Sequence, residues 1–324
     1  MKYDRILIDT SNFYMRAYFV NQNLTAVMED GTKMATGGIY TSLRMTQSLE
    51  KRFLAEDGKI YFLFDNCHSG NNRRKEIDPA YKSNRTKKDD SFYRSLDIFQ
   101  MILLNYKDNY RCVKREGFEA DDLVYPLVKS FRSGLKTLLI SNDLDWFRAI
   151  SENVHVAKYE NGDYEIYDIE KFKEKLGFAP TESSMIMYKS FRGDTSDNIP
   201  PGLPGIRSKD LDYIVEHFDT IKELLMSLKD ITELSDNLKE KIQDSYPRLS
   251  LNEKLVSYQP VTIEELKEDI YKCVFNPHTL HSLYTSLKFN TGNIDPRVAQ
   301  FYAKMEEKDE DDGDFFKFDK IKRI

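Results

Sequence analysis

Glu119-Ala120-Asp121-Asp122 and Thr137-Leu138-Leu139-Ile140-Ser141-Asn142-Asp143-Leu144-Asp145 are the stretches that decide the fold. Together they hold five carboxylates in two groups, each beside an apolar run that a folded chain would bury. The helix dipole favours acids at helix N-termini, which would be enough to explain the first group alone. It does not explain Asp143 and Asp145, which follow a strand-like run. Crowded carboxylates that lose hydration need protons, bases or metal ions as partners.

Composition indicates a soluble globular protein. The chain has 324 residues, 40% hydrophobic and 31% charged, enough for one large domain or two ordinary ones. We find no apolar run of the roughly 18–20 residues that cross a membrane, and we expect no signal peptide. Three cysteines (Cys67, Cys112 and Cys273) have no CxxC spacing, which favours a reducing compartment and buried thiols. We therefore expect a cytoplasmic protein, and we expect it to act as a monomer.

The net charge of −6 is distributed unevenly. Residues 306–314 alone hold seven acids and one lysine, so the rest of the chain is close to neutral. Residues 73–88 hold seven bases against two acids. Such a local basic patch is typical of a nucleic-acid contact, although a solvated basic loop would have the same composition.

Strand-like and helix-like segments alternate along the first half of the chain. The strand-like runs are residues 5–9, 59–65, 111–114 and 137–141, followed by 154–159 and 164–167; helices are expected over 10–19, 37–53, from 119 and from 146. This alternation predicts an α/β fold, a parallel sheet with helices on both faces. The strand ends would bring Asp9, Asp65 and Asp143 to the edge where such sheets bind ligands.

A long polar insertion separates the second and third strands. Residues 66–90 are basic and rich in turn formers, and residues 91–105 are amphipathic enough to pack. Insertions of this length in an α/β domain are usually functional or disordered. Tyr81, Lys82 and Arg85 stand out, because one aromatic and two cations lie within five residues.

Residues 193–206 contain three prolines and three glycines between two predicted helices, 181–191 and one capped by Ser208. A helix, a glycine-rich hairpin and a second helix present backbone N–H groups to phosphates. Asp194 and Asp197 add two acids. A partial calcium loop is the alternative, but the glycine and terminal glutamate of such loops are missing at the required offsets.

The C-terminal residues 291–324 are expected to form a tail. Residues 302–314 read as an acidic, disordered linker. Phe315, Phe316 and Phe318 then suggest a docking peptide, unless the tail folds back on the body.

Over residues 4–290 the chain resembles the 5′-nuclease family, which comprises flap endonucleases, phage 5′→3′ exonucleases and the nuclease domain of bacterial DNA polymerase I. It looks most like a bacteriophage member. The motifs are Ile8-Asp9 with Arg16-Ala17, Phe64-Asp65, Tyr81-Lys82-Ser83-Asn84-Arg85, Glu119-Ala120-Asp121-Asp122, Asn142-Asp143-Leu144-Asp145 and Gly193-Asp194-Thr195-Ser196-Asp197-Asn198-Ile199-Pro200. Two departures from the family pattern are the doubled proline before Gly202, and Arg207 where a glycine is usual.

The resemblance implies a PIN-like nuclease domain over residues 1–184, with a helical arch at about 70–110. A helix–three-turn–helix and helical DNA-binding region would follow over 185–290. One metal position would lie near Asp9, Asp65, Glu119, Asp121, Asp122 and Asp143, and a second near Asp145, Asp194 and Asp197. The ions would be two Mg²⁺, replaceable by Mn²⁺, with K⁺ at the hairpin. Two-ion sites stabilise the attacking and leaving oxygens of a phosphoryl displacement.

Catalytic roles are implied for Lys82, Arg85, Asp143 and Asp145. The candidate DNA-contacting residues are Arg16, Arg73, Arg74, Tyr81, Lys82, Arg85, Gly202, Gly205, Ile206, Arg207, Ser208 and Lys209.

The implied activity is divalent-metal-dependent cleavage of DNA with a 5′ flap, a nick or a 5′ end, and of RNA primers in RNA–DNA hybrids. The aromatic tail would bind a sliding clamp or single-strand binding protein. Two alternatives remain. A non-catalytic DNA-binding scaffold would need a broken acid position, and all nine are filled. A PIN-like ribonuclease would not need the hairpin after Gly193.

Overall fold

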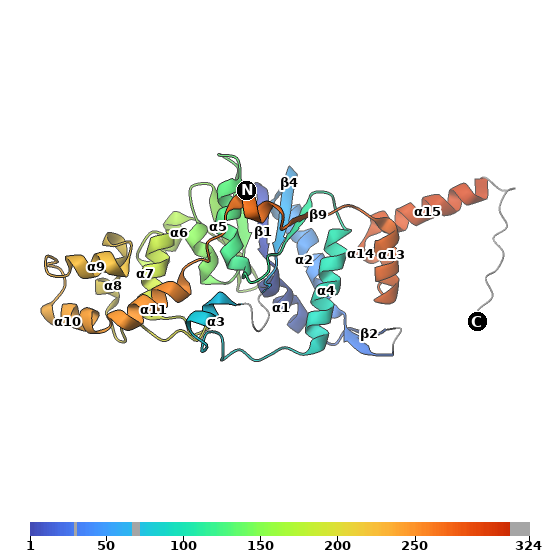
Figure 1. Ribbon diagram of the computed structural model, residues 1–324. Coiled ribbons are helices and arrows are strands. Elements are labelled where there is room, and N and C mark those ends of the chain that lie inside the picture. The colour runs from blue at the N-terminus through green and yellow to red at the C-terminus, as the bar shows by residue number, and fades with distance from the viewer. Residues whose placement is uncertain (29–30, 67–71, 312–324) are drawn as a thin grey trace.

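The computed structural model describes residues 1–28, 31–66 and 72–311, around a central seven-stranded sheet (Figure 1). The strand order is β8-β7-β6-β1-β4-β5-β9, and β2 and β3 form a separate hairpin. The strands are β1 (Tyr3–Asp9), β2 (Thr25–Val27), β3 (Lys33–Ala35), β4 (Leu54–Leu63), β5 (Tyr110–Val113), β6 (Thr137–Ile140), β7 (Val154–Glu160), β8 (Asp163–Tyr167) and β9 (Ile270–Lys272).

Five central strands are parallel, as the alternating pattern predicted, but the sheet as a whole is mixed. Ile8 of β1 lies opposite Phe62 of β4 and Ile140 of β6, both in parallel register. The edge strands β8 and β9 pair antiparallel with β7 and β5. An antiparallel edge strand needs no crossover helix, so the sequence alternation gave no signal for β9, which returns from far along the chain.

Helices cover both faces, because successive side chains of the central strands point to opposite sides. Leu7 belongs to a core with α5, α6, α7 and α8, whereas Ile6 and Ile8 belong to a core with α1, α2, α4 and α13. The helices are α1 (Thr10–Val20), α2 (Gly37–Phe53), α3 (Arg73–Ile77), α4 (Asp90–Leu104), α5 (Ala120–Ser130), the 3₁₀ turn η1 (Leu144–Ala149), α6 (Ile169–Leu176), α7 (Glu182–Arg192), α8 (Ser208–His217), α9 (Ile221–Ser227), α10 (Asp236–Asp244), α11 (Tyr246–Val256), α12 (Ile263–Lys267), α13 (Pro277–Ser286), α14 (Thr291–Ile294) and α15 (Pro296–Asp311).

Fewer residues of the insertion between β4 and β5 are available for an arch than the predicted range of about 70–110. Its second half forms α4, whose Phe92, Phe99 and Leu103 are buried in the core beneath the sheet. The predicted packing of this amphipathic half is therefore confirmed. Of the described residues, 72–89, which include the short helix α3, are left as the candidate arch, and the chain runs from α3 to α4 as a loop (Figure 1).

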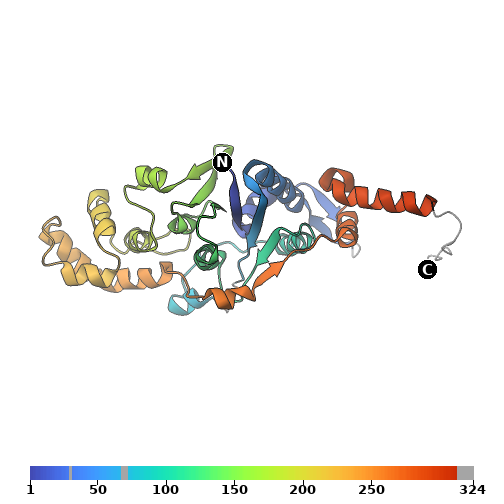
Figure 2. The same cartoon turned by 90° about the horizontal axis from the view of Figure 1, so that it is seen from above.

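One hydrophobic core crosses the domain boundary expected at residue 184. Leu7, Leu139 and Phe191 share a cluster with Leu211 and Leu249 of the helical region. Seen from above, α7 to α11 extend from one side of the sheet and α13 to α15 lie at the other (Figure 2). Among the described helices, none is long and apolar enough to cross a membrane.

The C-terminal segment differs from the expectation. Helix α15 continues through Asp311, where composition predicted a disordered linker from Tyr302. Tyr302 packs on α13, with its ring 4.2 Å from that of His281 and its hydroxyl 2.9 Å from His278 Nδ1. These contacts anchor the helix, so its acidic extension starts from a formed turn. The aromatic residues Phe315, Phe316 and Phe318 lie outside the described residues, as does Cys67.

Candidate active site

Carboxylates converge on one edge of the sheet, as the strand-end pattern predicted. Asp9 ends β1 and caps α1, accepting a bond of 3.1 Å from the Asn12 backbone N–H. Ser141, just after β6, donates its hydroxyl to Asp9 Oδ2 at 2.7 Å. Asp65, just after β4, accepts from the Ala120 backbone N–H at 2.8 Å. Parallel neighbours end at the same edge, so acids far apart in sequence become neighbours. Asp9 is thus the cap residue of α1.

Asp9, Asp121 and Asp143 are crowded by other acids, and within the described ranges none of the three forms an ion pair. Burial and repulsion from Asp65 raise the pKa of Asp9 to about 7. Burial and the Asp145 charge raise the pKa of Asp143 to about 6. Burial and Asp122 raise the pKa of Asp121 well above its usual range, and its Oδ1 is buried without a hydrogen-bond partner in the described part of the chain. Such groups gain most from a divalent cation, which removes the repulsion.

A second acidic group joins the sheet edge to the hairpin. Asp145, Asp194 and Asp197 each offer an oxygen, and these oxygens lie within 4.8 Å of one another, close enough to share one metal ion. Lys189 on α7 places its Nζ 2.7 Å from both Asp145 and Asp194. Burial opposes ionisation of Asp145, but Lys189 and Arg148 outweigh it and hold its pKa well below the usual range. A bound ion would therefore compete with Lys189 for these oxygens.

Arg74 is an internal anchor, which corrects its predicted role as a DNA contact. It is only 3% exposed and forks onto both oxygens of Asp122, at 2.7 and 3.0 Å. It also reaches Glu119 at 3.3 Å and donates to the backbone carbonyls of Leu255 and Ser257. A five-residue helix gives no periodicity that separates buried Arg74 from its exposed neighbour Arg73.

Both carboxylate oxygens of Asp122 accept hydrogen bonds from Arg74 and from the backbone. Its Oδ1 also accepts from the Gln259 backbone N–H at 2.8 Å, and its Oδ2 from the Glu119 backbone N–H at 3.2 Å. A carboxylate has about four lone-pair sites, and all four are engaged here in a side chain that is fully buried. This arrangement makes Asp122 an anchor for Arg74, and its place near a metal position stays a prediction.

The base of the arch is attached to both acidic groups. The Tyr81 hydroxyl donates to Glu119 at 3.0 Å and to Asp197 at 2.9 Å. Lys82 Nζ lies 2.6 Å from Glu119 and 3.7 Å from Asp197, and Arg85 pairs with Asp197 at 2.7 Å. Burial would raise the pKa of Glu119, but Lys82 and Arg74 lower it overall. Lys82 has a left-handed backbone with φ of 54°, a strain of the kind found at functional sites.

The hairpin after α7 contains four of the residues predicted to contact phosphate, and they differ in exposure. Gly202 is packed so tightly that a Cβ would lie 2.2 Å from the Ser190 carbonyl oxygen, so its role is close packing. Gly205 is exposed with φ of 77°, a conformation that favours glycine. Ile206 is buried in the core, so its side chain cannot contact DNA as predicted. Arg207, not Ser208, is the cap residue of α8, and it has no side-chain capping bond.

Arg207 and Lys209 are exposed cations at the end of the hairpin and the start of α8. Arg207 points into solvent and pairs with Asp210 at 2.7 Å. Ser208 and Lys209 are exposed in the first turn of α8, where backbone N–H groups are free for an anion. Arg73 is exposed on α3.

Several site residues were missed by sequence reasoning. Arg148 is fully engaged by Asp145, three residues before it, and by the Val256 carbonyl at 2.8 Å. Tyr258 stacks on Arg148 at 4.1 Å and donates to the Asp145 carbonyl at 3.2 Å. The spacing of three residues could have revealed Arg148, and Lys189 could have been suspected from its place inside a helix of buried residues. Nothing local signals Tyr258.

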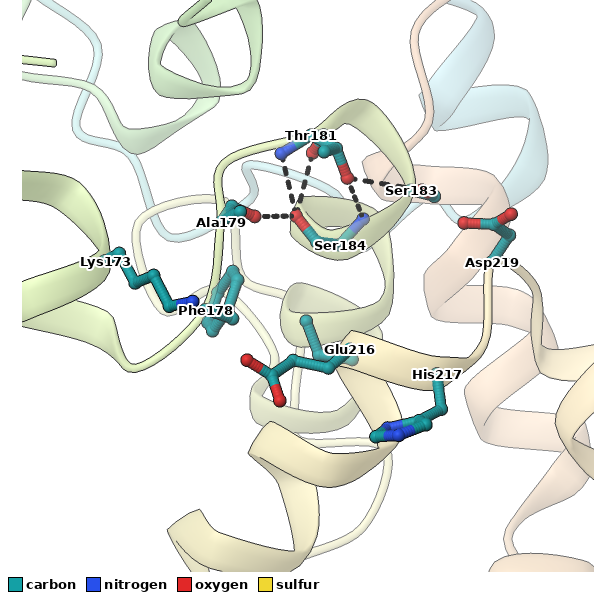
Figure 3. A pocket seen from close by; sticks show the side chains of 10 residues that line it. Lys173, Phe178, Ala179, Thr181, Ser183, Ser184, Glu216, His217 and Asp219 are labelled. Atoms are coloured by element: carbon teal, nitrogen blue, oxygen red, sulfur yellow. Dashed lines mark hydrogen bonds between the residues drawn. The ribbon is translucent and has the colours of Figure 1, made fainter. Parts of the chain in front are cut away.

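A cavity of about 490 Å³ lies between α6, α7 and α8 (Figure 3). Thr181 and Ser184, at the N-terminal end of α7, are joined to each other there by hydrogen bonds, and Glu216 and His217 of α8 line the other side. Asp194 follows the opposite end of α7, which at 11 residues is about 16 Å long. The acidic site is therefore separate from this cavity.

The raised pKa of Asp9 gives a testable dependence of stability on pH. A carboxyl whose folded pKa is about 7 binds more protons in the folded state between pH 4 and 7, so the free energy of unfolding falls as pH rises through that window. In EDTA, Asp9→Asn should flatten this fall and stabilise the protein at pH 8 by about 2 kcal/mol. Urea denaturation at pH 5 and 8 measures it. Asp57→Asn, at an exposed position of β4, is the control; equal slopes in all three proteins would contradict the prediction.

Comparison with known proteins agrees with this geometry. Residues 4–177 match the family model described as 5′-3′ exonuclease, N-terminal resolvase-like domain. A 5′-3′ exonuclease of Buchnera aphidicola subsp. Schizaphis graminum is 31% identical over 231 residues, covering 71% of this chain and 75% of the relative. DNA polymerase I of Caldicellulosiruptor bescii is 26% identical over 88% of this chain, which spans only 32% of that relative.

A solved structure shares the fold. The bacteriophage T5 flap endonuclease, crystallised in a product-like complex with DNA and metal ions, superposes with a TM-score of 0.55 at 18% identity, covering 94% of this chain and 99% of that one. Because this family model matches more than half of the chain, the chain belongs to the 5′-3′ exonuclease family.

Proposed function

We propose that this protein is a divalent-metal-dependent, structure-specific 5′ nuclease that cleaves phosphodiesters in branched or 5′-ended DNA. The observation that carries the proposal is the acidic edge itself. Carboxylates from the ends of β1 and β4, from the start of α5, from η1 and from the hairpin gather there, and two of them, Glu119 and Asp197, pair with Lys82 and Arg85 of the arch base. Its relatives are called 5′-3′ exonucleases and DNA polymerase I, and the T5 structure with the same fold is called a flap endonuclease.

The residues present fit divalent cations. The carboxylate oxygens of Asp145, Asp194 and Asp197 are close enough to share an ion. The Asp121 Oδ1, which has no hydrogen-bond partner in the described part of the chain and lies near the charges of Glu119 and Asp145, supports a second position. Hard oxygen donors of this kind suit Mg²⁺, with Mn²⁺ as a substitute. When bound, such ions would supply positive charge for the phosphate and lower the pKa of a nearby water.

The protein's own side chains would orient the phosphate. Lys82 and Arg85 lie between the two acidic groups, on a loop tied to the hairpin by the Lys82 N–H, which donates to the Asp197 carbonyl at 2.8 Å. An incoming phosphate would replace Glu119 as the partner of Lys82. The first turn of α8 and the exposed Gly205 would hold the backbone of the duplex. Asp194 and Asp197 would thus connect the hairpin that binds the duplex to the carboxylates that bind the ions.

Further features of the proposal concern partners. RNA primers in RNA–DNA hybrids are a second substrate class, K⁺ would bind at the hairpin, and the tail beyond residue 311 would dock on a sliding clamp or single-strand binding protein. We propose that the protein acts as a monomer in the cytoplasm.

One assay tests the function against its alternatives. A 5′-flap DNA, a nicked duplex and a single-stranded RNA are each incubated with Mg²⁺ and with EDTA. We expect Mg²⁺-dependent cleavage of the flap and the nick. Binding without cleavage would support a scaffold, and cleavage of the RNA alone would support a PIN-like ribonuclease.

Lys82 should serve the chemical step more than binding. Lys82→Ala is expected to lower kcat about 100-fold, because a positioned cation at the phosphate is lost, while the Kd for flap DNA changes less than about threefold. Single-turnover cleavage and fluorescence anisotropy measure the two. Lys87→Ala, an exposed lysine of the same loop, should leave kcat unchanged. Equal losses in kcat and binding for Lys82→Ala would contradict the assignment.

A further inference from the structure

Arg16 differs from the other cations near the acidic edge in its partners. Lys82, Arg85 and Lys189 each pair with a carboxylate of the site. Across the described ranges, no carboxylate pairs with Arg16; its one hydrogen bond runs from its guanidinium to the Tyr164 hydroxyl, at 2.6 Å. A guanidinium has five N–H donors, so four remain for an external acceptor, and its charge is not neutralised by an acid.

Aromatic rings hold this guanidinium in place. Its carbon lies 4.0 Å from the ring centroid of Tyr159 and 5.3 Å from that of Tyr164. The two tyrosines face each other across the β7–β8 pair, with centroids 5.2 Å apart at 70°. We call Tyr159 and Tyr164 the aromatic clamp. Ring faces attract a cation without occupying its N–H groups, so the clamp fixes the orientation of Arg16 and leaves its other N–H donors available for hydrogen bonds.

The tip of the β7–β8 hairpin is firmly built. Asn161 and Gly162 both have positive φ, 53° and 88°, as the tight two-residue turn of a hairpin requires. Asn142 exchanges two hydrogen bonds with the Tyr159 backbone, at 2.9 and 3.0 Å. The Asp163 carboxylate forms a two-pronged ion pair with Arg52 of α2, in which one nitrogen–oxygen distance is 3.0 Å. Two attachments to the body of the domain, at Asn142 and at Arg52, therefore hold this hairpin in place.

These attachments place the clamp beside the acidic edge. Tyr159 lies near the carboxyl end of β7, which runs parallel to β6, and Asn142 directly precedes Asp143. Arg16 follows Asp9 by seven residues, two turns of α1, so it lies on the same helix face about 10 Å along the axis. Arg16 therefore lies about two turns of α1 from Asp9, where Tyr159 and Tyr164 contact it.

We propose that Tyr159 and Tyr164 are positioning residues that orient Arg16 to bind a backbone phosphate of the DNA strand carrying the 5′ end. This inference rests on the proposed function for its ligand, DNA. It assigns to the β7–β8 hairpin a part in substrate binding, acting through Arg16 rather than by direct contact with the reacting atoms.

The test measures binding separately from cleavage. Kd for a 5′-flap DNA is determined by anisotropy in EDTA over a range of salt concentrations. Tyr159→Leu and Arg16→Ala are each expected to raise Kd about 10-fold, and the slope of log Kd against log salt should become shallower by about 0.9, the value for one lost phosphate contact. The Tyr159→Leu, Arg16→Ala double variant should bind no more weakly than Arg16→Ala. In Mg²⁺, KM should rise while kcat stays within twofold.

Two further variants keep the test decisive. Tyr164→Phe keeps the ring and removes only the hydroxyl, so it should fold and raise Kd by about threefold. Tyr271→Leu, an exposed tyrosine of β9 at the opposite edge of the sheet, should change neither Kd nor the slope. An unchanged salt slope in Tyr159→Leu, or additive losses in the double variant, would overturn the clamp. If the wild type binds the flap but does not cut it, the proposed function fails while the binding data still judge the clamp.

Discussion

Replacing Asp143 by asparagine is expected to abolish cleavage, with kcat falling at least about 1000-fold. Asp143 lies between the two acidic groups, half-buried, where burial and Asp145 raise its pKa to about 6. Such a carboxylate is held in place for a positive partner, and losing it removes several kcal/mol of charge stabilisation at about 1.4 kcal/mol per factor of ten. Cleavage of a 5′-flap DNA in Mg²⁺ measures the loss.

The asparagine variant should fold and bind as the wild type does. Its side-chain oxygen can still accept the bond of 3.0 Å from the Asp145 backbone N–H that begins η1. The hairpin and the first turn of α8 are untouched, so Kd for duplex DNA in EDTA should change less than twofold. Asp219→Asn, beside the cavity at the far end of α7, is the control and should cleave normally. Full activity in Asp143→Asn would refute the role of this edge.

How well the sequence predicted the site depends on how local each signal is. Asp9, Asp65 and Asp143 follow strand-like runs, and parallel strands necessarily end at one edge, so pattern alone brought them together. Asp194 and Asp197 were recognisable because glycine and proline force a turn there. In these cases the backbone, which local sequence largely determines, fixes the position of the side chain.

The cations were harder to predict than the acids. Arg73 and Arg74 are adjacent and chemically identical, yet one is exposed and the other is 3% exposed. Only the tertiary contact between α3 and the end of α11 decides which guanidinium is internal. Tyr258 reaches Asp145 from 113 residues away along the chain, so no local pattern signals it. Long, flexible side chains on separate elements are placed by packing, which one sequence does not reveal.

Arg74→Leu is expected to cost more stability than any other single change at this site, about 4 kcal/mol of unfolding free energy at neutral pH. The variant leaves Glu119, 4% exposed, and the fully buried Asp122 without their forked partner. Removing one member of a buried ion pair typically costs about 3–5 kcal/mol, because the remaining charge stays buried. The carbonyls of Leu255 and Ser257 lose their donor as well. Urea denaturation in EDTA measures the difference.

The pH dependence and a matched control distinguish this mechanism from general damage. The folded pKa of Glu119 is lowered, so its contribution to stability is present above the unfolded value of 4.5 and is lost as pH falls through the folded pKa. The deficit of Arg74→Leu should therefore be greatest above pH 5 and shrink in more acidic solution. Arg73→Leu changes the exposed neighbour and should stay within about 0.5 kcal/mol of wild type. If both variants lost the same stability, Arg74 would not be the anchor that joins the arch base to the acids.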